Sequence, residues 1–390
     1  MEIGDFHFLL SREGQRWLKE LAGTAVTPDN HLHLAERLRG EVTPGRAYAI
    51  LETILLRQRA GEKFERAAEM YFTRPALEQA SAETVSRYRA KRFHDTGLAT
   101  IADLGCGIGG DALALAEGAA VIGIDLNPVR LAMARENVAL YSRGAAFQPV
   151  QADLTQIRPL AVAAVFADPG RRDERGRRIY SVHQYRPPLD VLLAWRSRVP
   201  EMGIKISPGV DYDELPPEAE VEFISVQGEV REGVLWFGRL QRGVQRQATL
   251  LPGQHSLTSE AVSPVPVVPP GRFLYEPDGA VIRAHLVEQL AVRLNAAKIS
   301  YDIAYLTADS PTPTPFARCF AVEDHFPFQL KRLRHYLRER GIGRVTIKKR
   351  GSPLDPDVLQ KQLRLQGGLH RIIFLTQAGG EPVVIVGDEC

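Results

Sequence analysis

Four aspartates stand at or near the ends of short apolar stretches in the middle of the chain. Asp103 lies in IADL, Asp125 in GIDL, Asp153 in QADL, and Asp168 directly precedes Pro169 in FADP. Aspartate carboxylates accept hydrogen bonds from amines and hydroxyls. If the stretches are parallel strands, their carboxyl ends meet at one edge of a sheet, where α/β folds bind ligands. The pattern therefore predicts a polar ligand site at this edge.

A glycine-rich loop follows the first of these stretches, in IADLGCGIGGDALALA. Gly105, Gly107 and Gly109 let the backbone approach a ligand closely, and the helix expected to follow offers free N–H groups. Loops of this type also occur in nicotinamide and flavin proteins, so the loop alone does not identify the ligand.

The spacing of the acids narrows the choice of ligand. Asp103, before the first glycine, is placed to face a cationic amino-acid end. Asp125 follows about 20 residues later, the usual separation for an acid that binds a pair of ribose hydroxyls. Asp153 is placed to accept a hydrogen bond from an adenine amine. Asp125 and Asp153 could each instead be the N-cap of a helix.

An acid at the end of each of these consecutive strands is not a dinucleotide-binding pattern. From about residue 98 to residue 240 the chain resembles the class I S-adenosylmethionine-dependent methyltransferases. The resemblance implies that the first loop holds the methionine end of S-adenosylmethionine, the second acid its ribose and the third its adenine. A sulfonium methyl is already activated, so the protein must align a nucleophile and exclude water, and no metal is required. The implied cofactor-binding residues are Asp103, Gly105, Cys106, Gly107, Gly109, Asp125, Leu126, Asp153 and Leu154.

Asp168 and Pro169 resemble the first half of a motif found in amine-directed members of that family. There an Asp, Asn or Ser precedes two prolines and an aromatic residue. The acid and the following carbonyl accept hydrogen bonds from the target amine, and the aromatic ring stacks on the target base. The resemblance thus implies catalytic roles for Asp168 and Pro169. A glycine and an arginine replace the second half, and Tyr180 or Tyr185 of the following loop could supply a stacking face instead. Without the resemblance, Asp-Pro could be only a turn.

Arginines crowd the segment after Pro169, where two acids also lie. Arginine binds phosphate through paired hydrogen bonds, so a phosphate-bearing substrate is one interpretation, with Arg171 and Arg172 nearest the acid. A solvated loop with internal Arg–Asp pairing is the other. The residues are Arg171, Arg172, Arg175, Arg177 and Arg178, against Asp173 and Glu174.

A second basic stretch, KRLRHYLRERGIGRVTIKKR, covers residues 331–350. It holds nine Lys or Arg against the single acid Glu339, with aromatic residues between them. This is a local electrostatic footprint for nucleic acid, and it makes Lys348 and Lys349 candidate substrate-binding residues. The alternative is an exposed helix face followed by an edge strand that lysines protect from aggregation.

The wider chain also resembles a bacterial family of proposed methyltransferases with a THUMP-like C-terminal domain. The resemblance rests on DLGCGIGGDALALA, DPGRR, GRFLYEPDGAVIRAHLV and FPFQLKRLRHYLRERGIGRVTIKKRG, and it spans nearly the whole chain. Family copies mostly have Asp-Pro-Ala-Arg-Arg where this chain has Asp-Pro-Gly-Arg-Arg. THUMP domains proper are RNA-binding modules of tRNA-modifying enzymes, so RNA is favoured as a partner by analogy.

The apolar periodicity predicts an α/β fold with three domains. Residues 1–95 form an N-terminal helical domain. Residues 96–262 form a Rossmann-like methyltransferase sheet, mostly parallel, which a terminal antiparallel hairpin completes. The proline-rich SPVPVVPPG of residues 263–271 is a linker, and residues 272–390 form a small α+β domain.

The composition of the chain predicts its partners and its cellular compartment. The 390 residues carry a net charge of +2, which does not by itself predict a polyanionic partner. Cys106, Cys319 and Cys390 lack metal-ligand spacing and are expected to be free thiols in a reducing compartment. No apolar run approaches the roughly 18 residues of a membrane span, and the amino terminus does not resemble a signal peptide. We therefore expect a cytoplasmic protein without a metal or a membrane partner; its oligomeric state is not indicated.

The favoured hypothesis is an enzyme that methylates a nitrogen of a tRNA or rRNA base. A small-molecule or protein methyltransferase, whose basic C-terminal face is incidental, is one alternative. An RNA-binding protein that retains the fold with little activity is another.

Overall fold

The computed structural model describes residues 1–142, 146–173 and 175–390, and the chain forms two compact units. The first unit contains Met1–Glu220 and Glu232–Gly243; the second contains Val221–Arg231 and Val244–Cys390. The division into domains at residues 1–95, 96–262 and 272–390 stays a prediction.

The first unit begins with helices that pack on one another. Ser11 caps the second helix by accepting a hydrogen bond from the Gly14 N–H, and a proline is the first or second residue of the third, fourth and fifth helices. Phe6, Trp17 and Ile50 are buried between these helices. The helices are α1 (Ile3–Leu10), α2 (Arg12–Glu20), α3 (Pro28–Arg39), α4 (Pro44–Ala60), α5 (Arg74–Gln79) and α6 (Glu83–His94).

The sheet of the first unit has the strand order β3-β2-β1-β4-β5-β7. All neighbouring pairs in this order are parallel except β5 and β7, which are antiparallel. The strands are β1 (Thr100–Leu104), β2 (Ala120–Asp125), β3 (Phe147–Gln151), β4 (Ala164–Ala167), β5 (Met202–Ile206) and β7 (Glu229–Phe237). Successive strands lie outward from β1 on one side up to β3, and the chain then returns to β4 on the other side of β1. Ligands bind at such a switch point, outside the carboxyl ends of the strands.

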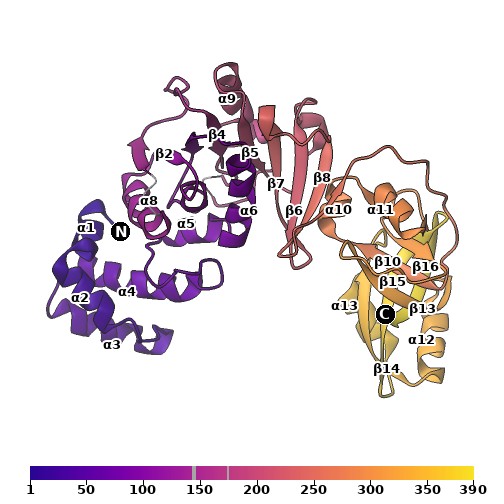
Figure 1. The fold of residues 1–390 in the computed structure, drawn as a ribbon. Coiled ribbons are helices and arrows are strands. Elements are labelled where there is room, and N and C mark those ends of the chain that lie inside the picture. Colours follow the sequence, from indigo (N-terminus) through magenta and orange to yellow (C-terminus); the bar gives the residue numbers. More distant parts are fainter. Residues whose placement is uncertain (143–145, 174) are drawn as a thin grey trace. The chain divides into compact units, whose positions relative to one another are not determined.

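Helices and 3₁₀ turns lie between these strands and directly after the last of them (Figure 1). They are α7 (Ala112–Leu115), α8 (Pro128–Tyr141) and α9 (Leu189–Leu193), with the 3₁₀ turns η1 (Val182–Gln184), η2 (Ala194–Ser197), η3 (Tyr212–Glu214) and η4 (Gly238–Leu240). The long apolar side chains of the strands form the core, in which Phe166 and Trp236 both pack edge-on against Phe93 of α6. The helix α6 thus covers this sheet although it precedes it in sequence.

The second unit contains β6 (Glu220–Val226), β8 (Arg246–Leu251) and β9 (His255–Thr258), and a further sheet in the order β11-β12-β10-β13-β16-β15-β14. The elements around that sheet are β10 (Phe273–Pro277), α10 (Gly279–Arg283), α11 (Val287–Leu294), β11 (Ala297–Lys298), β12 (Leu306–Ala308), β13 (Ala317–Pro327), α12 (Leu330–Glu339), β14 (Ile342–Lys349), α13 (Pro356–Leu363), β15 (Leu369–Ala378) and β16 (Glu381–Glu389).

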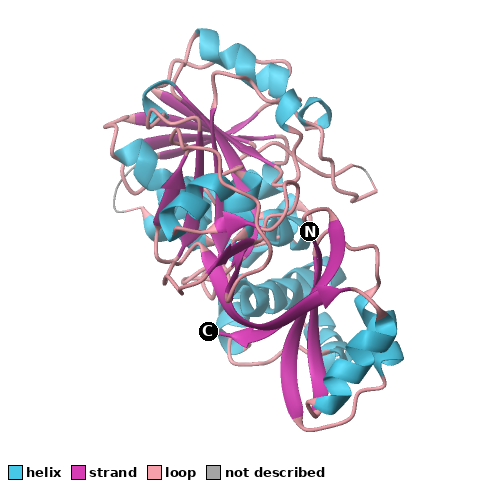
Figure 2. Ribbon diagram, turned by 90° about the vertical axis from the view of Figure 1, so that its right-hand side faces the viewer, coloured by secondary structure: helices cyan, strands magenta, loops and turns pink. Residues whose placement is uncertain are grey.

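The apolar faces of α12 and α13 pack against this curved sheet (Figure 2), where Leu333, Leu359 and Ile373 are buried together. The strand β14, which carries part of the second basic stretch, is an edge strand paired with β15. The expected fold class is confirmed: a mixed α/β protein with N-terminal helices, a Rossmann-like sheet with an antiparallel end, and a C-terminal α+β region.

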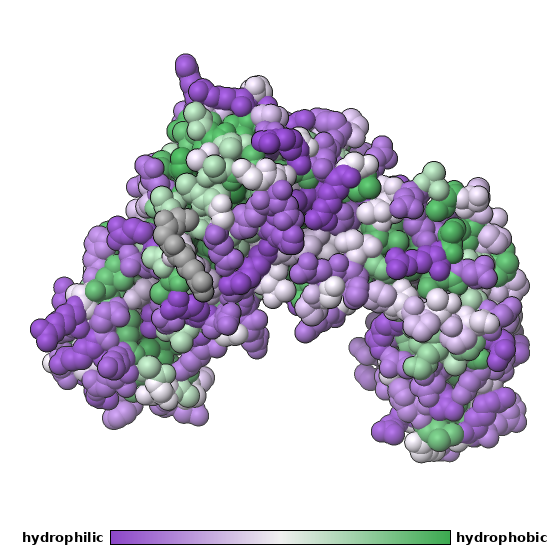
Figure 3. Space-filling view, viewed as in Figure 1, coloured by the Kyte–Doolittle hydropathy of each residue, from purple (hydrophilic) through white to green (hydrophobic). Residues whose placement is uncertain are grey.

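The surface drawn in Figure 3 is largely hydrophilic, with scattered hydrophobic residues. Within the described ranges, no helix is long and apolar enough to cross a membrane.

Candidate active site

The glycine loop and the Asp-Pro segment lie next to each other at the switch point of the sheet. The backbone N–H of Asp168 donates to the Leu104 carbonyl over 3.1 Å, at the end of β1. Gly105 has a φ of +80°, and a Cβ placed there would lie 2.9 Å from the Asp168 carbonyl oxygen. Glycine is therefore required at this position, both by its backbone conformation and by the close approach of the two segments.

Asp125, the last residue of β2, binds backbone rather than capping a helix. Its carboxylate accepts hydrogen bonds from the Gly107 N–H over 3.0 Å and from the Asn127 N–H over 2.8 Å. Asn127 is the N-cap of α8, since its side chain accepts from the backbone N–H groups of Val129 and Arg130. Asp125 thus ties the glycine loop to the end of β2 and is not an N-cap.

Asp153 lies two residues beyond β3, in a turn. Its Oδ1 accepts hydrogen bonds from the Thr155 N–H over 2.9 Å and the Thr155 hydroxyl over 2.7 Å. These bonds lower the pKa of Asp153 below its ordinary value. No helix begins at this turn in the described chain, so Asp153 is not an N-cap either.

Asp103 carries a buried carboxyl group that has no hydrogen-bond partner within the described part of the chain. Its side chain is 1% exposed, and neither carboxyl oxygen has a hydrogen-bond partner among the described residues. Burial raises the pKa of Asp103 well above its ordinary value, and the nearby carboxylates of Asp111 and Asp168 raise it further. Since buried polar groups are nearly always satisfied, a carboxyl group of this kind fits a site that a bound cationic group completes.

Asp168 lies directly after β4 and forms an ion pair that the sequence did not predict. Its Oδ2 is 2.7 Å from the Nζ of Lys205, in β5. Burial raises the pKa of Asp168, but Lys205, Arg171 and Arg89 outweigh it and hold this pKa below the ordinary value. A lysine within the apolar stretch MGIKI was the signal in the sequence, because a charged side chain in a buried strand needs a partner.

The remaining cofactor candidates differ in exposure. Gly107 and Gly109 have φ of +55° and +83°, Cys106 and Leu154 are buried, and Leu126 is 65% exposed. An exposed leucine beside Asp125 leaves an apolar surface available to a ligand.

The arginines near Asp168 bind mainly within their own part of the fold. Arg171 donates to the Ile206 carbonyl over 3.1 Å, and Arg172 donates to the Gly176 carbonyl over 2.8 Å. Arg177 pairs with Asp173. Internal pairing is thus seen for this part of the loop, while Glu174 lies outside the described residues.

The two candidate stacking tyrosines lie in different environments. Tyr185 is 1% exposed, and its hydroxyl accepts a hydrogen bond from the Ser207 N–H over 2.9 Å. Tyr180 is 54% exposed, with its ring against Gly209. An open hollow of about 600 Å³ lies beside it, also lined by Arg178 and Gln184. Tyr180 is therefore the ring that a substrate could reach.

The lysines selected in the C-terminal stretch both have partners in the second unit. Lys348 forms an ion pair with Glu276 and lies 5.5 Å from the Phe320 ring centroid. Lys349 donates to the Leu354 carbonyl over 3.1 Å. The exposed cations of the stretch include Lys331 and Arg338 on α12.

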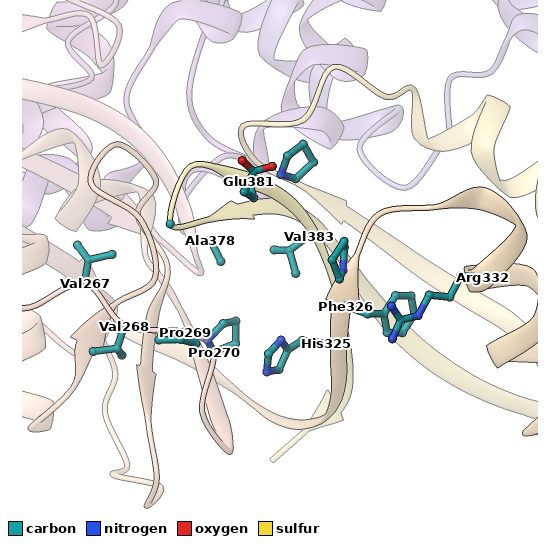
Figure 4. Close-up of a pocket in the computed structure, with 13 residues that line it drawn as sticks. Val267, Val268, Pro269, Pro270, His325, Phe326, Arg332, Ala378, Glu381 and Val383 are labelled. Atoms are coloured by element: carbon teal, nitrogen blue, oxygen red, sulfur yellow. The ribbon is translucent and has the colours of Figure 1, made fainter.

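A mainly apolar pocket of about 380 Å³ lies in the second unit. Figure 4 shows the residues that line it. Pro269, Pro270, His325 and Phe326 line it, and Arg332 lies over the Phe326 ring, 4.6 Å from its centroid. Within the described ranges, no group of three or more His, Cys, Asp or Glu side chains could hold a metal ion.

Three family models match parts of the chain. Residues 101–167, which contain the glycine loop and β4, match a methyltransferase domain. Residues 317–389 match a THUMP domain-like model, and residues 2–60 match a domain of unknown function. Together with the switch-point site, these matches define the class as a methyltransferase with a THUMP-like C-terminal domain.

The relatives agree with this class. Uncharacterized S-adenosylmethionine-dependent methyltransferases of two Mycobacterium tuberculosis strains are 36% identical to the chain over 349 residues, which is 86% of this chain and 94% of each relative. The crystal structure of a proposed methyltransferase from Porphyromonas gingivalis W83 matches with a TM-score of 0.79 at 21% identity, covering 96% of this chain and 97% of that one. The chain belongs to the S-adenosylmethionine-dependent methyltransferases and is an enzyme that uses this cofactor.

Proposed function

We propose that this enzyme transfers the methyl group of S-adenosylmethionine to a nitrogen of an RNA base, in tRNA or rRNA. The observation that carries the proposal is the pairing of the glycine loop with Asp168-Pro169 at the switch point of the sheet. The cofactor supplies an activated sulfonium methyl, and the chain must hold a nucleophile against it.

The residues at this edge fit the cofactor. Asp103, buried without a partner among the described residues, would face the ammonium group, and the glycine loop from Gly105 to Gly109 would let the backbone lie close to the methionine end of the cofactor. Asp125 would bind the ribose hydroxyls and Asp153 the adenine amine. Cys106, Leu126 and Leu154 would line the site.

Asp168 and the Pro169 carbonyl would accept hydrogen bonds from the target amine. An acceptor holds the nitrogen in place and increases its electron density, so an ionised Asp168 suits this role. Arg171 and Arg172 would fix the loop around the substrate through their carbonyl bonds, and the exposed Tyr180 would stack on the base.

RNA is favoured over other substrates by the second unit. The THUMP-like match falls on residues 317–389, and α12 carries exposed cations within it. RNA would lie along α12 and reach the exposed Lys349 of β14. Lys348 would contribute less because Glu276 already binds it.

The test uses tritiated S-adenosylmethionine with three pools from bacterial cells: total RNA, protein and small metabolites. We expect label in RNA with the native enzyme and at least a hundredfold less, on the order of a lost transition-state acceptor, with Asp168→Ala. Asp95→Ala, which removes an exposed acid of the surface pair with Lys91, is the matched control and should transfer normally.

The destination of the label decides the substrate class. Label in protein or metabolites instead of RNA would show that the substrate is a protein or a small molecule. The proposed role of Asp168 would still stand. Cofactor binding without transfer to any pool would contradict the proposal.

A further inference from the structure

Lys205 is a buried cation at the centre of the site. It belongs to β5 and is 2% exposed. Its Nζ lies 2.7 Å from Asp168 Oδ2 and 2.8 Å from the Ser81 hydroxyl, and 3.7 Å from a carboxylate oxygen of Glu232 in β7. An acid, a hydroxyl and a second acid therefore surround this ammonium group.

The same ion network continues into α6. Arg89, also 2% exposed, forms ion pairs with Glu232 and with Asp111, the residue before α7. Its guanidinium lies 5.0 Å from the ring centroid of Phe166, the residue of β4 two positions before Asp168. Ser81 and Arg89 precede the sheet in sequence, so a segment outside the methyltransferase strands reaches the acid at the transfer point.

Stability alone does not explain this network. A buried ion pair contributes little net free energy of folding, because removing both charges from water costs about as much as their attraction returns. An apolar side chain at the place of Lys205 in β5 would give the fold at least the same stability. What an apolar residue cannot do is hold one carboxylate oxygen of Asp168 at a fixed place and keep the group ionised.

The orientation of Asp168 follows from these contacts. Among the described residues, the side-chain hydrogen bond of Asp168 involves Oδ2. The second oxygen is left to accept from an incoming N–H group. A carboxylate with one oxygen bound to an ammonium group is a poor base but an oriented acceptor, since its charge is already partly neutralised.

We propose that Lys205 is a positioning residue for methyl transfer, which fixes one oxygen of Asp168 and is itself held by Ser81 and the Arg89–Glu232 pair. Ser81 and Arg89, which precede the methyltransferase strands in sequence, thereby complete the active site. This inference rests on the proposed role of Asp168 as acceptor.

The charged and titratable groups around Asp168 come from several elements, and each affects its ionisation. The cations favour the carboxylate and the other acids oppose it. They are Lys205 of β5, Arg89 of α6, Arg171 of the same loop, Asp103 of β1, Asp111 before α7, Glu232 of β7 and Tyr185 of the loop before α9.

The first measurement needs no substrate. The full chain is labelled with aspartate carrying ¹³C at the side-chain carboxyl, and the Asp168 signal is assigned by its loss in Asp168→Asn. We expect Lys205→Met to raise the titration midpoint of Asp168 by roughly 1–3 pH units, the range for loss of an adjacent opposite charge. Lys205→Arg keeps a positive charge, so its Asp168 midpoint should lie between those of the native protein and of Lys205→Met. Lys91→Met, which removes an exposed lysine of α6, should leave the midpoint unchanged.

The second measurement is the rate of methyl transfer to the pool that the native enzyme labels. Lys205→Met should lower kcat by about a hundredfold, as small misplacements of a reacting group do, with little change in cofactor affinity measured by calorimetry. The acid limb of its pH–rate profile should move to higher pH, in parallel with the carboxyl titration. This parallel movement separates positioning from simple loss of structure.

An unchanged Asp168 midpoint in a Lys205→Met protein that still binds cofactor would overturn the inference, whatever the substrate is. A failure to label RNA alone contradicts only the proposed substrate. If Lys205→Met does not fold, Ser81→Ala keeps every charge and removes one contact of Lys205; it should lower kcat several-fold at unchanged cofactor affinity, and native kcat in this variant would also overturn the inference.

Discussion

The Oδ2 atom of Asp125 accepts a hydrogen bond from the backbone N–H of Gly107 over 3.0 Å. The acid that ends β2 therefore holds the glycine loop that follows β1. Both proposed halves of the cofactor site, the loop and the ribose acid, are joined by this bond, and a change in one is expected to affect the other.

Replacement of Asp125 should weaken cofactor binding. A hydrogen bond to a charged group contributes about 1.5–3 kcal/mol, so Asp125→Ala should raise the Kd of S-adenosylmethionine by about tenfold to a hundredfold. Asp125→Asn keeps an acceptor for Gly107 and should have a smaller effect. Calorimetric titration measures both, with Asp95→Ala as a surface control. If Asp125→Ala bound S-adenosylmethionine as tightly as the native protein does, Asp125 would not be a cofactor-binding residue.

Gly105→Ala should disturb both the loop and Asp168. The φ of +80° is strained for alanine, and the new Cβ would lie 2.9 Å from the Asp168 carbonyl oxygen. Gly97→Ala is the matched control, because its φ is +68° but no atom lies within 4 Å of the place that an alanine Cβ would take. We expect Gly97→Ala to lower the free energy of unfolding by about 1–2 kcal/mol, the cost of left-handed backbone.

Gly105→Ala should lower the free energy of unfolding further than that control and should also reduce methyl transfer. Chemical denaturation and the tritium assay measure the two effects. Equal stability and normal transfer in both variants would show that the loop has room to move away from Asp168.

Arg92→Met should be strongly destabilising. Arg92 of α6 is 4% exposed and pairs with Glu220, which is fully buried; it also donates to the Leu240 carbonyl over 2.5 Å. Removing one partner leaves a buried charge uncompensated, at a cost of about 3–5 kcal/mol. Arg37→Met, which breaks an exposed pair with Glu20, should cost at most about 1 kcal/mol. Similar losses in the two variants, measured by urea unfolding, would contradict the expected dependence on burial.

The cations of α12 should control the salt dependence of RNA binding. We expect Lys331→Gln with Arg338→Gln to reduce the slope of log affinity against log salt by about 1–2, because each lost phosphate contact removes about one released counterion. Filter binding of total tRNA over a range of KCl concentrations measures the slope. Lys19→Gln, an exposed lysine of α2, is the control. An unchanged slope in the double variant would show that RNA does not bind along α12, either because it binds another surface or because it does not bind the protein.

The sequence by itself determined the features that depend on residues close together in the chain, namely the strands, the helices and the glycine loop. The spacing of apolar stretches and glycines predicted a parallel sheet with a glycine loop after its first strand, and the alternation of strands and helices brought the strand ends to one edge. Asp125 and Asp168 could be selected because each directly ends or follows a strand. The methyltransferase class, its cofactor and the THUMP-like region were predictable for the same reason.

Only the tertiary structure decided which side chains meet across long separations. Lys205 binds Ser81 across 124 positions, and Arg89 binds Glu232 across 143. Lys348 looked like a free cation in a basic run, but Glu276 pairs with it from a strand 72 residues away. The sequence did not distinguish Tyr180 from Tyr185 as the stacking residue. In the folded chain the Tyr185 ring is buried and the Tyr180 ring is exposed. Ion pairs and burial depend on which strands and helices become neighbours, and local sequence patterns carry no record of those partners.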